Sequence, residues 1–232
     1  MLWKDIFYGP VLSRRLGYSL GVNLLPRKRK ICNFNCVYCE CGLNDKKAPK
    51  EPLPTVEEYR DSIIQALTEM NNKGQTIDHI TFSGNGEPTL HPDFDKIIDI
   101  TIENRNKFYP ESKIAVLTNS TNLHLDRVFN SLLKIEKRIC KLDAGTERIY
   151  QLIDAPETGA TLDQITEKLI RFKGNLIVQT IFLRGTINGE PIDNYSGAEF
   201  DEYLKRLDKI KPQAIMIYSL DRVAPFNTIE AL

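Results

Sequence analysis

From residue 55 onward, the chain alternates between two patterns of hydrophobic and polar positions. One pattern repeats every three to four residues and is typical of an amphipathic helix, whereas the other is a short apolar run typical of a buried strand. Residues 55–72 show the helical pattern, and Thr55 with Glu58 predicts a capping box at its start. The predicted apolar stripe of this helix consists of Ile63, Ile64, Leu67 and Met70.

The same alternation continues to residue 220 and predicts a parallel α/β fold. The further helices are expected at residues 92–108, 125–135, 162–173 and 199–209. The strands are expected at residues 18–24, 77–82, 114–118, 138–142, 176–183 and 214–220. Strands that alternate with helices form right-handed crossovers and a parallel sheet. Six such units are too few for an eight-stranded barrel, so we expect a partial (β/α)6 TIM-like barrel with a curved sheet.

Neither a long linker nor an internal repeat divides the chain. We therefore expect one core domain over residues 1–232, with a short C-terminal tail at 221–232 and no auxiliary domain. Ligands of parallel α/β folds lie at the carboxyl ends of the strands. The turns to search are Ser83–Pro88, Thr118–Ser120, Asp143–Thr146 and Ser219–Arg222.

Charge is balanced over the whole chain but not along it. The 232 residues carry a formal net charge of +0, which excludes a generally basic nucleic-acid coat or membrane-surface binder. Residues 1–50, however, hold a net charge of +7 and four of the five cysteines. The chain opens without the apolar run of a signal peptide and has no apolar run long enough to span a membrane, so we expect a cytoplasmic protein. In a reducing compartment, clustered cysteines are typical of metal or redox ligands.

The strongest chemical signal is the segment Cys32-Asn-Phe-Asn-Cys36-Val-Tyr-Cys39. Three thiolates can bind three irons of a [4Fe–4S] cluster and leave the fourth iron open to a cofactor or substrate. The alternative is a structural zinc site in which Cys41 supplies the fourth thiolate. A zinc-stabilised RNA-binding module is therefore the competing function.

The cysteine motif, with its aromatic residue Tyr38 before the last cysteine, resembles the signature of the radical S-adenosylmethionine superfamily. The turn Gly84-Asn85-Gly86-Glu87-Pro88 resembles the Gly-Gly-Glu-Pro turn of that superfamily, with Asn85 as a departure. The segments Tyr8–Gly17 and Gly84–His91 are similar to a stand-alone subgroup related to wyosine-base tRNA synthases and, more distantly, to the molybdenum-cofactor cyclase.

This resemblance implies an enzyme with two cofactors, a [4Fe–4S] cluster and S-adenosylmethionine. Reductive cleavage of S-adenosylmethionine would give a 5′-deoxyadenosyl radical that abstracts hydrogen from an unidentified substrate. It also implies a flavodoxin- or ferredoxin-type electron donor. The basic run Arg27–Lys30 favours a small anionic substrate over RNA, because residues 51–232 carry a net charge of −7.

The resemblance also assigns site residues. Cys32, Cys36 and Cys39 would hold the cluster, Tyr38 would pack near the adenine, and the turn from Gly84 through Asn85 and Gly86 to Glu87 would receive the amino group of S-adenosylmethionine. By their position at strand ends, Asn119, Ser120 and Asp143 are candidates for the ribose and the carboxylate. Gln179 and Tyr218 either line the adenine or substrate side or are ordinary strand residues.

Two cysteines are left over. Cys41 is either a substrate-facing thiol or an incidental loop residue, and Cys140 is expected to pack within a strand. Two cysteines are too few for a second complete cluster.

Overall fold

The computed structural model describes residues 2–218, 220 and 224–231. Its helices are α1 (Val56–Asn72), η1 (Pro88–Leu90), α2 (Phe94–Phe108), η2 (Thr121–His124), α3 (Asp126–Leu133), α4 (Glu147–Ile153), α5 (Leu162–Ile170) and α6 (Gly197–Ile210). Its strands are β1 (Phe7–Ser13), β2 (Gly17–Val22), β3 (His79–Phe82), β4 (Lys113–Thr118), β5 (Lys137–Lys141), β6 (Ile177–Ile181), β7 (Leu183–Ile187), β8 (Glu190–Asp193), β9 (Ala214–Tyr218) and β10 (Ile229–Ala231).

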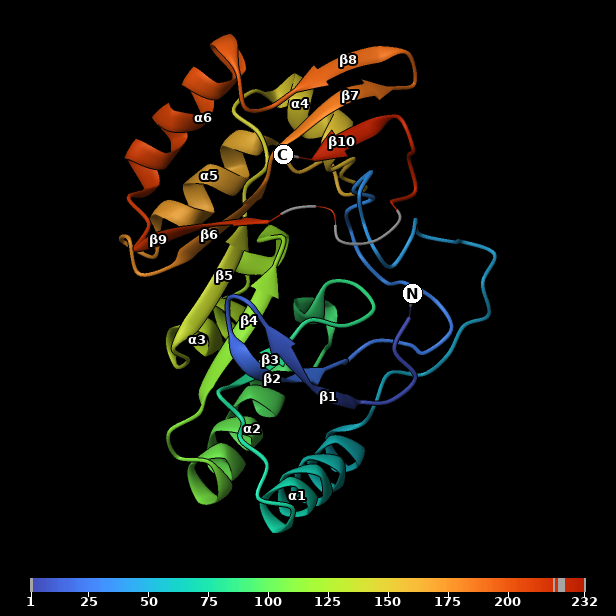
Figure 1. Cartoon of the computed structure of the whole chain (residues 1–232), viewed down its shortest axis with the longest axis vertical. Coiled ribbons are helices and arrows are strands. Elements are labelled where there is room, and N and C mark those ends of the chain that lie inside the picture. Colours follow the sequence, from blue (N-terminus) through green and yellow to red (C-terminus); the bar gives the residue numbers. More distant parts are fainter. Residues whose placement is uncertain (1, 219, 221–223, 232) are drawn as a thin grey trace.

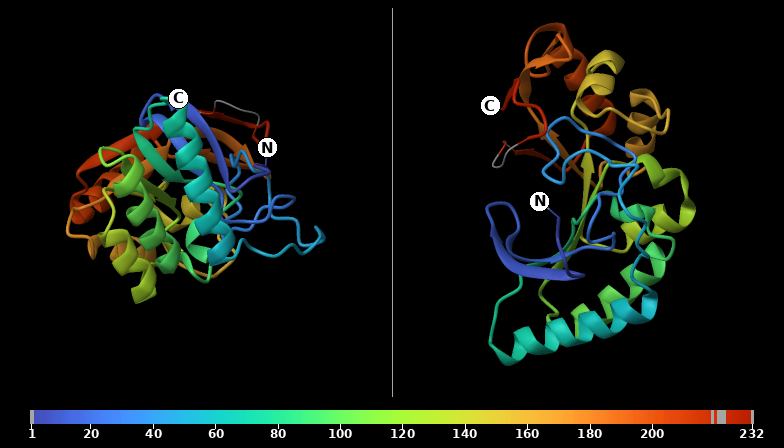
Figure 2. Two further views of the ribbon diagram at one scale, coloured as in Figure 1. Left: turned by 90° about the horizontal axis from the view of Figure 1, so that it is seen from below. Right: turned by 90° about the vertical axis from the view of Figure 1, so that its right-hand side faces the viewer.

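A curved seven-stranded sheet organises the molecule, in the order β1-β2-β3-β4-β5-β6-β9. The six strands from β2 onward pair in parallel, and β1 adds an antiparallel edge. The long helices lie along one side of the sheet, which curls into a half-barrel (Figures 1 and 2). The predicted partial (β/α)6 TIM-like barrel is therefore confirmed.

Helix α1 begins where the sequence predicts. Thr55 caps it, with the Thr55 side chain accepting from the Glu58 backbone and the Glu58 carboxylate accepting from the Thr55 backbone. The predicted apolar stripe is correct for Ile63 and Leu67, which are fully buried, but Ile64 is 40% exposed. Adjacent helical residues point about 100° apart, so Ile64 cannot share the buried face of Ile63.

The hydrophobic core has two sides because side chains alternate across each strand. On β4, Ile114 and Val116 belong to the large core shared with the helices. Ala115, between them, faces the concave side and packs in a small cluster with Leu16 and Ile139. The concave side is therefore filled at the amino ends of the strands, and the carboxyl ends remain for polar residues.

The structure departs from the prediction after β6. The expected strand at 176–183 is interrupted at Phe182, and β7 leaves the main sheet to pair with β8 and β10. Helix α4 was also not predicted. Of the predicted turn Ser219–Arg222, only Leu220 lies within the described residues, as do 224–231 of the predicted tail. None of the described helices is long and apolar enough to cross a membrane.

Candidate functional site

The cysteine loop follows β2 and is paired with the glycine turn after β3. Ile31 donates its N–H to the carbonyl of Asn85 (2.9 Å) and accepts the N–H of Glu87 (3.0 Å), forming a parallel bridge with Gly86. Gly86 has a φ of 141°, and a Cβ there would overlap the Ile31 carbonyl. A glycine is therefore required for the loop and the turn to approach each other.

The opposite side of the loop is fastened to the end of α4. The Val37 N–H donates to the carbonyl of Ile153 (3.0 Å), and the Asn35 N–H donates to that of Asp154 (3.0 Å). The Glu157 N–H donates to the carbonyl of Asn33 (2.9 Å). Because both sides of the loop are hydrogen-bonded, the cysteines are positioned by the fold.

The thiols differ in their surroundings. Burial raises the pKa of Cys32 to about 11 and raises that of Cys36 well above its ordinary value. A hydrogen bond from Cys41, with the nearby Lys30 ammonium also contributing, lowers the pKa of Cys39 to about 6. The Lys30 side chain is itself buried, and its Nζ donates to the Gly42 carbonyl at 3.1 Å.

This donor set fits an iron–sulfur cluster. Thiolate is the usual ligand of such clusters, and three neighbouring thiols leave one iron without a protein ligand. No three His, Cys, Asp or Glu side chains in the described part of the chain gather closely enough to hold a single metal ion. Ligands of a cluster bind separate irons and stand farther apart than those of one zinc ion.

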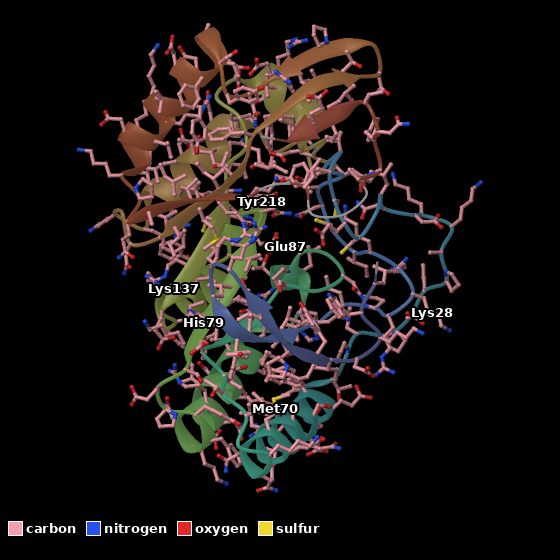
Figure 3. All side chains as sticks on the ribbon, in the orientation of Figure 1. Lys28, Met70, His79, Glu87, Lys137 and Tyr218 are labelled. Carbon is pink, nitrogen blue, oxygen red and sulfur yellow. The ribbon has the colours of Figure 1, made fainter. Side chains whose placement is uncertain are left out.

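Glu87 is buried at the centre of the site (Figure 3). Its Oε1 accepts from Thr89 N (3.2 Å), Thr89 Oγ1 (2.6 Å) and Thr118 Oγ1 (2.8 Å), and its Oε2 accepts from Asn119 N (2.7 Å). Burial raises the pKa of Glu87, and these hydrogen bonds oppose the rise. The carboxylate therefore joins the glycine turn to the end of β4.

Asn85, the departure from the double-glycine pattern, points its side chain into the protein. Its Nδ2 donates to the carbonyls of Trp3 (2.9 Å) and Pro26 (2.7 Å), and its Oδ1 accepts the Trp3 N–H (2.8 Å). A Cβ at Gly84 would overlap Asn23, whose Oδ1 accepts the Asn85 N–H at 3.0 Å. Side-chain contacts within the chain thus hold the turn in shape.

Asn119 and Ser120 are adjacent in sequence, but their side chains point in different directions. The Asn119 Nδ2 donates to Asn33 Oδ1 (2.6 Å) and lies 3.6 Å from the Cys32 Sγ, so Asn119 belongs to the cysteine site. Ser120 has a φ of 69° and is fully buried. Its hydroxyl lies near the thiol of Cys140, whose pKa is raised by burial to about 12. The structure therefore does not bring the Ser120 side chain to the other candidates.

A buried charge cluster lies at the end of β5. The Tyr38 hydroxyl donates to the Asp143 carboxylate, and the Lys141 Nζ contacts that carboxylate and the Asp154 Oδ1 (2.8 Å). The Lys141 Nζ also lies 4.4 Å from the centroid of the Tyr38 ring. Burial raises the pKa of Asp143, and the nearby Asp154 raises it further. One ammonium group thus serves two buried carboxylates beside the cysteine loop.

The two remaining candidates flank this cluster. The ring of Tyr218 lies 5.8 Å from that of Tyr38, in an edge-to-face arrangement, and burial raises the pKa of Tyr218 well above its ordinary value. Gln179 pairs with Lys141 across the sheet, and its Nε2 lies 3.9 Å from the Met216 Sδ. The predicted residues thus surround the carboxyl ends of β3 to β6 and β9, except for the Ser120 side chain.

Sequence reasoning missed Lys141, Asp154 and Asn194. Lys141 precedes Asp143 by two positions, and alternate strand residues share a face, so the pattern could have identified it. Asn194 Nδ2 donates to the carbonyls of Asp143 (2.7 Å) and Ile181 (2.8 Å), but it lies in a segment that shows no motif.

Comparison with known proteins agrees with this geometry. Residues 29–195 match the family model described as the Radical SAM superfamily. Because this match covers more than half of the chain, the chain belongs to the radical SAM superfamily and to its iron–sulfur enzymes. Its cofactors are therefore a [4Fe–4S] cluster and S-adenosylmethionine. Membership favours this interpretation over the zinc-stabilised RNA-binding module.

Individual relatives support the assignment. A UPF0026 protein from Methanocaldococcus jannaschii is 35% identical over 211 residues, which are 89% of this chain and 61% of that protein. A protein named GTPase Obg from Brachyspira hyodysenteriae is 33% identical over 230 residues, 97% of this chain and 31% of that protein. The chain thus spans less than two thirds of either relative.

More distant similarities concern the subgroup and the fold. A protein named Probable GTP 3′,8-cyclase from Halobacterium salinarum is 29% identical over 130 residues, 56% of this chain and 30% of that protein, in line with the predicted kinship to the cyclase. The crystal structure of a radical SAM methyltransferase from Sphaerobacter thermophilus aligns with a TM-score of 0.63 and 18% identity, covering 90% of this chain and 59% of the other. The similarity to the methyltransferase structure concerns the fold alone.

Proposed function

We propose that this chain is a radical S-adenosylmethionine enzyme in which Cys32, Cys36 and Cys39 hold three irons of the cluster. The observation that carries the proposal is the backbone pairing between Ile31 and Gly86. It joins the cysteine loop to the glycine turn one residue before the first thiol. A cluster on this loop would therefore lie beside the turn that receives S-adenosylmethionine.

The chain holds and orients both cofactors. When bound, they would supply reductive cleavage of the sulfonium and, through it, abstraction of hydrogen from the substrate. The Gly84 carbonyl faces the thiols, since it lies 3.4 Å from the Cys41 Sγ, and we assign it to the amino group of S-adenosylmethionine. Asn85 and Glu87 would act by holding the turn, because their side chains are already hydrogen-bonded within the protein.

Polar residues at the ends of β5, β6 and β9 would bind the rest of S-adenosylmethionine. Tyr38 and Asp143 are assigned to the adenosine, with Tyr218 and Gln179 at its border. Lys141 would hold Asp143 in position, because its ammonium contacts the carboxylates of both Asp143 and Asp154. Tyr38 and Cys36 are both buried, which would keep water from the radical.

The charge pattern supports an acidic electron donor of the flavodoxin or ferredoxin type. Lys46, Lys47 and Lys50 are exposed on the loop that directly follows the cysteines. Leu43, on the same loop, is 45% exposed and would supply an apolar contact. Arg27 and Lys28 form a second basic segment that is more exposed than the buried Lys30 (Figure 3 labels Lys28 on this outer loop). So small a basic area favours a small anionic substrate over RNA.

The deciding experiment is a metal and sulfide analysis of the anaerobically purified protein. We expect about four irons and about four sulfides per chain, with anaerobic formation of 5′-deoxyadenosine after reduction. The Cys36→Ala variant should lose both, whereas Cys140→Ala, which removes a buried thiol on the helix side of β5, should keep both. Zinc without sulfide, or deoxyadenosine formation by Cys36→Ala, would contradict the proposal.

A further inference from the structure

Helix α4 packs directly against the part of the cysteine loop that contains Cys36. The Val37 N–H donates to the Ile153 carbonyl at 3.0 Å, so the residue after Cys36 is fixed to the end of this helix. Two residues before Cys36, the Phe34 ring meets the Tyr150 ring edge-to-face, with 5.7 Å between the ring centroids. Tyr150 therefore projects from α4 toward the middle of the cysteine loop.

The hydroxyl of Tyr150 is buried and has no hydrogen-bond partner among the described residues. Buried hydroxyls nearly always have a partner, because a buried polar group without one destabilises the fold. Two other deeply buried tyrosines follow this rule. The Tyr59 hydroxyl lies 2.7 Å from Thr101 Oγ1, and the Tyr203 hydroxyl lies 2.7 Å from Thr180 Oγ1. Tyr150 differs from them, since it offers a donor that no described residue accepts.

The surroundings of this hydroxyl indicate which acceptor it serves. Burial raises the pKa of Tyr150, so the hydroxyl keeps its proton and acts as a donor. Three nearby acidic groups raise this pKa further. Asp154 and Glu147 belong to α4 and its C-terminal cap, and Asp154 already forms an ion pair with Lys141 at 2.8 Å. The third group, Cys36, lies on the facing loop, so its sulfur is the acceptor across the contact between α4 and the loop.

We infer that the Tyr150 hydroxyl donates a hydrogen bond to the Cys36 sulfur of the bound cluster and thereby raises the reduction potential of the cluster. A sulfur bound to iron still accepts hydrogen bonds, and such bonds help to set the potential of an iron–sulfur cluster. Tyr150 is thus a tuning residue for the entry of the electron. This inference rests on the proposed function, because it requires a cluster on Cys36.

The direction of the effect follows from charge. The reduced cluster carries one more negative charge than the oxidised cluster, and a hydrogen bond strengthens as the charge on its acceptor grows. The Tyr150 hydroxyl therefore stabilises the reduced cluster more than the oxidised one. The hydroxyl keeps its proton in both states, so no proton moves with the electron.

The test is a redox titration of the cluster-loaded protein without S-adenosylmethionine. Tyr150→Phe removes only the hydroxyl and keeps the ring. We expect it to lower the preference for the reduced cluster about tenfold, which is about 59 mV for a one-electron couple. Tyr59→Phe, which removes a buried hydroxyl from α1, should keep the wild-type potential.

Electron–nuclear double resonance of the reduced protein in D₂O gives a second readout. The wild type and Tyr59→Phe should show an exchangeable deuteron coupled to the cluster that Tyr150→Phe lacks. A wild-type potential in Tyr150→Phe, an equal fall in Tyr59→Phe, or no missing deuteron would overturn the inference and leave the proposed function intact.

Two further outcomes concern cluster loading. If Tyr150→Phe fails to load a cluster that the wild type and Tyr59→Phe hold, the hydroxyl supports the fold itself, and the inference is overturned. Failure of the wild type to load iron and sulfide would instead refute the proposed function, and this inference with it.

Discussion

The carboxylate of Glu87 and the backbone N–H of Asn119 meet at 2.7 Å, which joins the glycine turn after β3 to the first residue after β4. The four hydrogen bonds that Glu87 makes here all come from donors, two of them from Thr89 and one from Thr118. An ionised carboxylate satisfies all of them, whereas a group that carries its own N–H cannot. The turn therefore depends on an acceptor at position 87.

We expect Glu87→Gln to lower the free energy of unfolding by about 2 kcal/mol, because its amide N–H₂ would face the Asn119 N–H. Affinity for S-adenosylmethionine should fall as well, since the turn would lose its support. Urea denaturation and isothermal titration measure the two effects. Glu103→Gln, at an exposed position on α2, is the control. Equal stability of the two variants would contradict this role for Glu87.

Gly86→Ala should break the backbone pairing between Ile31 of the cysteine loop and the glycine turn. The substitution combines a φ of 141° with an overlap between the new Cβ and the Ile31 carbonyl. Gly159→Ala is a matched control, because Gly159 has a φ of 67° but open space around its Cβ position. We expect the control to lose about 1 kcal/mol of unfolding free energy and Gly86→Ala to lose clearly more. Only Gly86→Ala should also lose iron after anaerobic reconstitution, and normal iron content in it would refute the coupling.

Most of the main sheet could be predicted because its signals are local. Strands β3 and β4 contain apolar runs that are followed by small or polar residues, and Thr55 with Glu58 marks the start of α1. The three-stranded sheet was missed, although Asn188-Gly189 between β7 and β8 is a hairpin signal. Strand β1 was also missed, although it pairs with β2 as a local hairpin across residues 14–16.

Lys141→Met should strongly destabilise the protein. It removes the only cation in contact with both Asp143 and Asp154 among the described residues and leaves two buried carboxylates facing each other. Removing one partner of a buried ion pair costs about 3–5 kcal/mol. Urea denaturation should show this loss in Lys141→Met but not in Lys137→Met, on the same strand. The double variant Lys141→Met/Asp154→Asn should recover part of the lost stability. If it recovers none, repulsion between the two carboxylates is not the cause of the loss.

The candidate site was predictable where one short segment carries the chemistry. Cys32, Cys36 and Cys39 are visible because their spacing is itself the motif. The direction of a side chain at a strand end is set by tertiary contacts instead, so the sequence could not distinguish Asn119, beside Cys32, from the buried Ser120. Likewise, no local sequence pattern indicates that Asp154, at the end of α4, forms an ion pair with Lys141.

The free energy of unfolding should fall as the pH drops below about 6.5, because the buried His91 and the half-buried His79 both have lowered pKa values. Burial lowers the pKa of His91, whose Nδ1 accepts the Asp93 N–H (3.1 Å) while its Nε2 lies 2.8 Å from the Pro54 carbonyl. Burial also lowers the pKa of His79. The unfolded chain then binds more protons than the folded protein just below the ordinary histidine pKa, so stability rises with pH in that window.

The measurement is urea denaturation across this pH range. His91→Gln should be less stable than the wild type above the window and should lose less stability on acidification, since one of the two histidines is gone. His124→Gln, at an exposed position, should keep the wild-type profile. A His91→Gln profile parallel to that of the wild type would show that His91 does not contribute.

Finally, reversing the charge of the loop after the cysteines should weaken the reaction with the electron donor. Lys46 and Lys47 are exposed close to the cysteine site, so the variant Lys46→Glu/Lys47→Glu would repel an acidic flavodoxin. At low salt, we expect the KM for flavodoxin to rise by about tenfold, with a smaller effect as added salt screens the charges. Formation of 5′-deoxyadenosine with dithionite, a small chemical reductant, should be unchanged. This contrast separates docking from chemistry.

A matched reversal on α6, Lys205→Glu/Lys209→Glu, controls for net charge, because both lysines are exposed but belong to a helix remote in sequence from the cysteine loop. It should leave the KM for flavodoxin close to that of the wild type. An equal rise in both double variants would mean that flavodoxin responds to the total charge of the protein. A loss of dithionite-driven activity in Lys46→Glu/Lys47→Glu would mean that the loop shapes the cluster site itself. Only a rise confined to flavodoxin and to the cysteine loop identifies residues 43–50 as the docking surface.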